Sequence, residues 1–357
     1  MAYSTIPKPS LHFNTKLYTG NGSSQNISGL DFKPDFTWIK SRSLVKDHDL
    51  YDIVRGVDKP LESNTTGAEQ DAGGQGLTSF RSDGFAIGNR STINTNSATQ
   101  VAWNWLAGGG QGSSNTDGSI NTTYTSANTT SGFSIVKYTG TGANATVGHG
   151  LGVAPAMIIV KNLQNTYEWI IGHKDLASGG TGFSANWYFN GFNTSAKNQN
   201  ATASWNSASP TTSVFSLHSG ATYMNASGQA NIAYCFAEKK GYSKIGSYTG
   251  NGNANGPFIY TGFKPAFVLH KKSSATDDWN IFDNKRNPHN VVNKYLIPNS
   301  TGAEGTSTNR DFLSNGFKIR SSSNYVNQSG QTFIYMAFAE EPLVANSGTD
   351  GVPATAR

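Results

Sequence analysis

The chain has 357 residues and a formal net charge of +5, with 14% charged, 36% hydrophobic and 11% aromatic residues. This composition, with 40 glycines, is typical of many short strands joined by turns and unlike helix-rich proteins. The basic residues are scattered with no run of five, so the charge pattern of nucleic-acid binding is absent. The aromatic content is high enough to build buried cores, which excludes a disordered chain.

The first residues, "MAYSTIPKPS", have neither the basic start nor the apolar core of a signal peptide. No stretch reaches about 18 consecutive apolar residues, so we expect no membrane insertion. The one cysteine, Cys235, lies in the apolar run "NIAYCFAE" and is expected to be a buried, inert thiol. A single cysteine gives no disulfide framework and no cysteine-based zinc site.

One short pattern occurs three times along the chain: a proline, an apolar run, and a lysine six residues after the proline. The three segments are "FKPDFTWIKS" (32–41), "VAPAMIIVKN" (153–162) and "FKPAFVLHKK" (263–272). Each proline follows a Tyr-Thr-Gly step, and the tyrosine and proline pairs are Tyr18 and Pro34, Tyr138 and Pro155, and Tyr248 and Pro265. The copies start 120 and 110 residues apart (138 − 18 and 248 − 138), which fits a small domain and is too long for a solenoid repeat.

In the first copy, "FTWIK" partly alternates apolar and polar residues, which predicts a half-buried antiparallel strand. The proline before it costs no ladder hydrogen bond, and Asp83-Gly84 predicts a turn that leads into a strand. The segment "KDHDLYD" (46–52) gathers aspartates around His48. A cation site would use these residues, but we favour a polar loop that leads into a strand.

Residues 107–131 are rich in Gly, Ser, Thr and Asn, and we predict a linker there. The second copy then departs from the other two in the aromatic segments "SANWYFNGFN" and "ATASWNS". Trp187, Tyr188 and Trp205 are therefore the candidate ligand-binding residues, because aromatic faces stack on sugar rings. The alternative is that they fill the core of that domain.

The third copy repeats details of the first. Asp283 and Arg286 match Asp52 and Arg55 at the same spacing, which predicts structural salt bridges. Glu304 repeats Glu69 in a "TGAE" segment, and Glu340 repeats Glu238 at the end of the closing strand. Recurrence across copies favours a structural role for these carboxylates. The tryptophans of the repeated frame are expected to lie in the core: Trp38, Trp103, Trp105, Trp169 and Trp279.

These patterns predict an all-β fold of three tandem antiparallel β-sandwich domains of the jelly-roll, lectin-like kind. The expected domains are copy one with an N-terminal extension (1–106), the linker (107–131), copy two (132–239), copy three (240–341) and a C-terminal tail (342–357). We find no nucleophile elbow, phosphate-binding loop or H-E-x-x-H motif. We therefore expect no enzyme, no cofactor, no catalytic residues and no metal site.

In the repeated frame the chain resembles a family of bacteriophage virion proteins common in marine and cyanobacterial phages. The signatures include "KPSLHFNTKLYTGNG", "LYDIVRG", "LTSFRSDGFAIG", "VGHGLGVAPAMIIVKN" and "YCFAEKKGYSKIGSYTGNG", and they span nearly the whole chain. Proteins of this kind are labelled tail-fibre-like or virion structural. The resemblance implies a phage particle component with lectin-like β-sandwiches, and it brings no established active site.

The expected function is a structural protein of the virion surface, either a tail fibre or spike or a capsid decoration or head fibre, with lectin-like adhesion to host glycans. Its expected partners are other virion proteins, a host cell-surface polysaccharide and further copies of itself in a trimer, but neither nucleic acid nor membrane. Assembly would take place in the host cytoplasm. Two alternatives stay open: a virion-associated glycan-degrading enzyme, which needs two carboxylates in one cleft, and a purely structural spacer.

Overall fold

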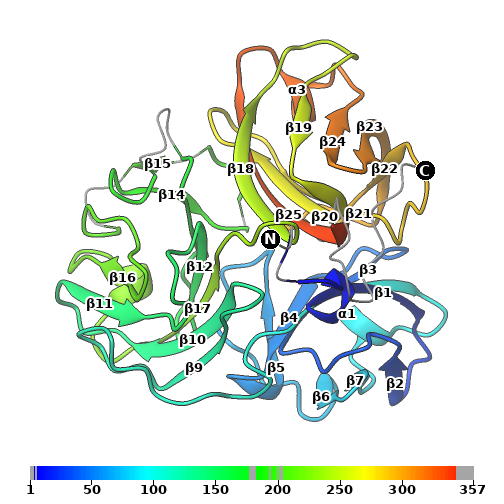
Figure 1. Cartoon of the computed structure of the whole chain (residues 1–357). Helices are drawn as coiled ribbons and strands as arrows, with labels where there is room; N and C mark the ends of the chain where they lie inside the picture. Colours follow the sequence, from blue (N-terminus) through cyan, green and yellow to red (C-terminus); the bar gives the residue numbers. More distant parts are fainter. Residues whose placement is uncertain are drawn as a thin grey trace.

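The computed structural model describes residues 4, 6–176, 182–192, 194–197, 199–200 and 204–342. Within these ranges nearly all regular structure is antiparallel strand and the helices have three or four residues, so the prediction of an all-β sandwich fold is confirmed. Figure 1 shows three lobes around a common centre. We call them unit one (8–106), unit two (107–239) and unit three (240–342). No helix in the described part of the chain is long and apolar enough to span a membrane.

Unit one is the blue and cyan lobe of Figure 1. Its elements are η1 (Pro9–Leu11), β1 (Phe13–Thr19), β2 (Gln25–Ser28), β3 (Phe36–Ser41), β4 (His48–Asp52), β5 (Gly56–Glu62), β6 (Leu77–Arg81), β7 (Gly84–Ile87), α1 (Ser91–Asn94) and β8 (Thr99–Trp105). The inner sheet has the order β1-β8-β3-β4-β5, and the outer sheet has the order β2-β7-β6.

Unit two repeats this plan in the green lobe. Its elements are β9 (Tyr124–Asn128), β10 (Phe133–Thr139), β11 (Ala145–Gly148), β12 (Met157–Asn162), β13 (Ile170–His173), β14 (Trp187–Asn190), β15 (Gln199–Asn200), β16 (Val214–Leu217), α2 (Thr222–Asn225) and β17 (Ala230–Phe236). The larger sheet has the order β15-β14-β13-β12-β17-β10-β9, and β11 pairs with β16 in the smaller one.

Unit three is the yellow to red lobe. Its elements are β18 (Ser243–Thr249), β19 (Phe258–Tyr260), β20 (Phe263–Lys272), β21 (Trp279–Asp283), β22 (Val292–Tyr295), β23 (Gly305–Leu313), β24 (Gly316–Ile319), α3 (Asn324–Asn327) and β25 (Thr332–Pro342). The inner sheet has the order β18-β25-β20-β21, and the outer sheet has the order β19-β24-β23-β22.

The inner strands are buried on both faces, which corrects the prediction of one wet face. Every residue of β3 is buried. Phe36 and Trp38 belong to the core that the three units share, whereas Ile39 belongs to the core between the two sheets of unit one. The alternation therefore separates two cores, because successive side chains point to opposite faces of a strand. All five tryptophans of the repeated frame are buried, as expected.

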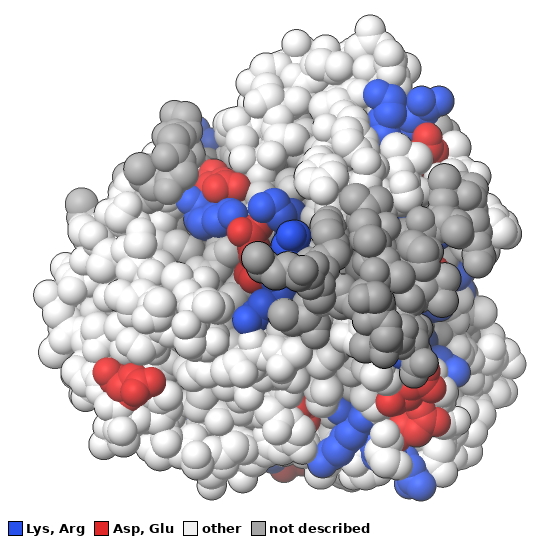
Figure 2. Space-filling model, in the orientation of Figure 1, with Lys and Arg blue, Asp and Glu red and all other residues white. Residues whose placement is uncertain are grey.

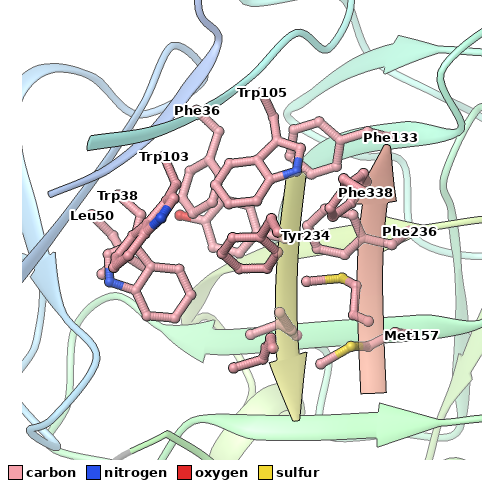
Figure 3. Close-up of a cluster of buried hydrophobic side chains, with 14 of the residues drawn as sticks. Phe36, Trp38, Leu50, Trp103, Trp105, Phe133, Met157, Tyr234, Phe236 and Phe338 are labelled. Carbon is pink, nitrogen blue, oxygen red and sulfur yellow. The ribbon is translucent and has the colours of Figure 1, made fainter. Parts of the chain in front are cut away.

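The three units meet in one aromatic core. Trp105, Phe236 and Phe338 occupy the same place in the closing strands β8, β17 and β25, and their ring centroids lie 5.7 to 6.4 Å apart. Figure 3 shows these rings together with Phe133 and Tyr234. Aromatic pairs at this separation add to the stability that buried area provides. The units therefore share their main hydrophobic core.

The repeated lysine joins each unit to the next. Lys161 in unit two donates to Thr66 O in unit one at 3.1 Å, and Lys40 in unit one donates to Thr301 O in unit three at 3.2 Å. Lys271 donates to Ser195 O in unit two at 3.3 Å. Each bond crosses a unit boundary, so the three contacts close a ring.

A second contact follows the same ring. Trp169 Nε1 donates to Glu62 O at 3.0 Å, Trp279 Nε1 donates to Gly191 O at 3.1 Å, and His48 Nε2 lies 3.0 Å from Ile297 O. The acceptors lie at the end of β5 in unit one and just after the matching strands β14 and β22 in the other units. In unit two this loop was not recognised from the sequence, because it reads "NTSAK", whereas units one and three have "NTTGAE" and "NSTGAE".

Residues 107–131, predicted as a linker, pack against the rest of unit two. β9 extends its large sheet by pairing with β10, and Ile120 bridges to Val147 and is buried. The carboxylate of Asp35 in unit one accepts hydrogen bonds from Ala107 N and Gly109 N. The segment therefore joins units one and two and also forms part of the second. The predicted tail after 342 lies outside the described residues.

Candidate binding pocket in the third unit

The aromatic residues predicted to bind a ligand lie inside unit two. Trp205 is 1% exposed, packs edge-on against Phe183 and donates to Trp187 O at 3.1 Å. Tyr188 is 6% exposed and stacks on Tyr223, and Trp187 is half-buried against the shared core. A ring that is covered on both sides cannot stack on a sugar, so this placement favours the alternative that these residues fill the core.

The structure instead has a cavity of about 190 Å³ in unit three, at one end of the space between the inner and outer sheets. Its lining combines two tyrosines with a carboxylate and two amides, the groups that stack on sugar rings and bind hydroxyls. The lining residues are Asp278, Asn280, Tyr295, Ile297, Ser307, Asn309, Tyr325 and Val326.

Strand alternation and the short helix α3 position these side chains. On β21, Trp279 and Ile281 belong to the shared core and Phe282 to the core of unit three, so Asn280 faces the same side as Phe282. Tyr325 lies on α3 and is 62% exposed. The polar floor therefore comes from a rigid strand, and an exposed aromatic ring stands at the edge of the cavity.

The hydrogen bonds within the pocket leave several polar groups available. Asp278 Oδ1 accepts from Asn299 Nδ2 at 2.7 Å, and Asn280 Nδ2 donates to Asp278 O at 3.1 Å. Among the described residues, neither the Tyr295 nor the Tyr325 hydroxyl makes a hydrogen bond. A ligand can therefore bind donors and acceptors here without breaking the bonds that hold the pocket.

Unit one fills the equivalent place with a charged side chain. The equivalences follow from the frame: Arg90 and Ser323 each lie four residues before the last residue of the short helix, and Asp49 and Asn280 each follow the aromatic residue that starts the fourth strand. Arg90 Nε donates to Asp49 Oδ2 at 2.7 Å, and its Nη2 donates to Glu62 and Gln70 at 3.1 and 3.0 Å. Serine at position 323 removes this filling side chain.

Unit two fills the same place with aromatic rings. Its residue at the position of Arg90 is Ala221, which is completely buried. Two positions further on, Tyr223 stacks on Tyr188 with ring centroids 5.9 Å apart, and its hydroxyl lies 3.0 Å from Ser204 Oγ. Unit three has Tyr325 at the position of Tyr223, but its ring is 62% exposed. Of the three equivalent places, the one in unit three therefore stays open.

Beside the pocket, unit three buries a cation that lacks a carboxylate partner within the described residues. The Arg310 guanidinium stacks on Phe282 at 3.7 Å, and its Nη2 lies 3.1 Å from His270 Nδ1. Burial lowers the pKa of Arg310 to about 10, and it also lowers the pKa of His270 well below its usual value. The aromatic face and a neutral histidine therefore stabilise this cation.

The recurring carboxylates are engaged in ion pairs. Arg55 pairs with Asp52 and Arg286 with Asp283, with both partners of each pair buried, so the predicted salt bridges are confirmed. These aspartates also accept hydrogen bonds across unit boundaries, from Tyr234 at 2.7 Å and Trp103 at 3.0 Å. The face drawn in Figure 2 shows charges of both signs in small groups on an otherwise uncharged surface.

The glutamates at the ends of the closing strands are paired as well. Glu238 contacts Lys174 at 2.7 Å and Lys244 at 3.0 Å, which lowers its pKa although burial opposes the shift. Glu340 contacts Lys264 at 2.6 Å. Within the described ranges no cluster of three or more His, Cys, Asp or Glu could hold a metal ion.

Comparison with known proteins gives a family and no activity. No curated protein matches the chain. The family described as a domain of unknown function (DUF7483) matches residues 8–342, a span that contains all three units and the pocket. The chain therefore belongs to the DUF7483 family.

Proposed function

We propose that this chain is a structural protein of a bacteriophage particle surface and that its third unit binds a host glycan. The resemblance of the repeated frame to virion proteins supports the first part. The ring of contacts between units supports it further, because a shared core and closed contacts give the rigid body that a particle component needs. The pocket in unit three supports the second part.

One observation carries the glycan proposal: three equivalent places differ, and the open one is lined by sugar-binding chemistry. A space that only had to be filled would tolerate a cation or rings, as units one and two show. Unit three has serine in place of the arginine and leaves a cavity whose lining includes Asn280 and Asn309, which are only 6% and 4% exposed. Buried amides that line an open cavity are suited to a ligand that carries hydroxyl groups.

The test measures binding of the full chain to a panel of bacterial surface polysaccharides and their oligosaccharides. The Ser323→Arg/Asn280→Asp variant rebuilds the filling pair of unit one, and we expect it to abolish binding. Arginine is compatible with this position because the backbone angles of Ser323 (φ −58°, ψ 136°) nearly equal those of Arg90 (φ −56°, ψ 124°).

The control is Trp187→Ala in unit two, which should leave glycan binding unchanged. Loss of binding in that variant, with binding retained in the filled variant, would move the site to unit two. Absence of binding by the wild-type chain would leave it a structural spacer. Release of reducing ends from the polysaccharide, lost on mutation of Glu238 or Glu340, would instead establish the glycan-degrading alternative. Labelled protein imaged on particles locates it on the head, neck or tail.

A further inference from the structure

We propose that the pocket of unit three takes the terminal residue of a glycan and that this residue carries no acidic group. The ligand is thus a neutral or amino-substituted pyranose rather than a uronic acid. This inference rests on the proposed glycan function and narrows its ligand class. Three features of the pocket lead to it: its size, its single lining charge and its remaining hydrogen-bonding groups.

The size of the cavity limits the ligand to about one ring. Its 190 Å³ equals roughly six water molecules at about 30 Å³ each, and sites for larger organic ligands begin at about 300 Å³. The walls come from β21, β22, β23 and α3 together with the residues beside them. A cavity with walls from four elements suits the end of a saccharide chain better than its middle.

The lining carries one charge, and that charge is negative. Of the eight lining residues, Asp278 is the one with a carboxylate or a basic group. The nearby lysines are engaged elsewhere: Lys272 pairs with Asp277 at 2.5 Å, and Lys271 donates to backbone carbonyls. Arg310 is completely buried against Phe282 and is not a lining residue. A uronate would therefore bring a second negative charge beside Asp278, which is unfavourable.

The hydrogen-bonding groups point to the same ligand class. An ionised carboxylate is an acceptor only, and one oxygen of Asp278 is already bound by Asn299. The other oxygen can accept a further hydrogen bond, which a sugar hydroxyl or an ammonium group donates and a uronate carboxylate does not. The amides of Asn280 and Asn309 and the two tyrosine hydroxyls provide donors and acceptors for neighbouring hydroxyls. The exposed ring of Tyr325 offers a face for the C–H side of the pyranose.

The experiment titrates the full chain calorimetrically with methyl glycosides of a hexose, a hexosamine, an N-acetylhexosamine and a hexuronic acid. We expect at least one of the first three to bind about tenfold or more tightly than the uronic acid, as repulsion between two close carboxylates requires. Asp278→Asn should weaken the favoured sugar severalfold and reduce the discrimination against the uronic acid. Asp311→Asn is the matched control, since it removes the same charge from β23 of the same unit, and Asp311 does not line the pocket.

Two results would overturn the proposal: uronic acid binding as tightly as the best neutral or amino sugar, or discrimination that Asp278→Asn leaves unchanged. The Ser323→Arg/Asn280→Asp variant separates this failure from failure of the glycan function. Uronic acid binding that the filled variant abolishes contradicts the ligand class alone. If none of these sugars and no polysaccharide binds the wild-type chain, both proposals fall.

Discussion

At the scale of single residues, the lysine of the repeated proline, apolar run and lysine pattern has the same structural role in all three units. Each lysine is buried, and its ammonium group donates to backbone carbonyls, one of them in the neighbouring unit. Burial lowers the pKa of Lys40 and Lys161 to about 8 and that of Lys271 to about 7. The repetition made these lysines visible in the sequence, but it could not show that they join neighbouring units.

Lys271 gives the stability of the protein a predictable pH dependence. Its folded pKa of about 7 lies below the ordinary 10.5, so the unfolded chain holds more protons between these values. Stability therefore rises with pH from about 7 to 10, and it is lowest where Lys271 is charged. In Lys271→Met two carbonyls lose their donor, which costs about 1 to 3 kcal/mol, and the rise should become shallower. Urea unfolding at pH 6.5 and 9.5 measures both effects. If the free energy of unfolding rises by the same amount between these pH values in the wild-type and variant proteins, Lys271 does not have this role.

A second repeated residue anchors the short helix of each unit. The hydroxyls of Tyr18, Tyr138 and Tyr248 donate to Ile93 O, Met224 O and Val326 O at 2.8, 2.7 and 2.9 Å. We expect Tyr138→Phe to lower the free energy of unfolding by about 1 to 2 kcal/mol, because it leaves a buried carbonyl without a donor. Tyr325→Phe removes an exposed hydroxyl and should change stability by less than about 0.5 kcal/mol. Chemical denaturation compares the two variants, and equal effects would contradict the anchoring role.

At the scale of elements, the strands and turns were largely predictable from the sequence, whereas the pocket was not. The alternation in "FTWIK" and the Asp83-Gly84 step correctly predicted β3 and the hairpin before β7. Ser323 alone does not predict a pocket, because its small side chain is informative only when it is aligned with Arg90 in the first copy. An equal spacing could have aligned them: Asn94, Asn225 and Asn327 each precede the closing aromatic by 11 residues (105 − 94, 236 − 225 and 338 − 327).

The hairpin that opens β7 depends on a glycine. Gly84 has φ +143°, and a Cβ there would lie 1.9 Å from Ile27 O, so Gly84→Ala forces apart the paired strands β2 and β7. We expect a loss of more than about 2 kcal/mol. Gly73→Ala is the control, since Gly73 has φ +59° and open space around it, and it should cost about 1 kcal/mol. Thermal unfolding followed by circular dichroism ranks the variants, and similar losses would contradict the steric argument.

At the scale of the whole molecule, the shared core predicts one cooperative unfolding transition. Trp105 contacts Phe236 and Phe338 from the other two units, so Trp105→Ala should cost about 3 to 5 kcal/mol and weaken all three. Hydrogen exchange of β12 and β20 measures this spread. Ile87→Ala, in the core within unit one, is the comparison, and in one cooperative transition it should also lower protection in β12 and β20, in proportion to its own loss of stability. Unchanged protection in units two and three of Trp105→Ala would show that the units unfold independently.

The ring also fixes the order in which the protein can be completed during synthesis. The edge of unit one at Arg42 binds both carboxylate oxygens of Glu304, which lies 262 residues later in the chain. This edge therefore stays without its partner during synthesis until Glu304, directly before β23, has left the ribosome. In a chain truncated before that point, the Arg42 edge has no loop to bind. We expect such fragments to bind chaperones or to bind the same loop of another copy of the chain.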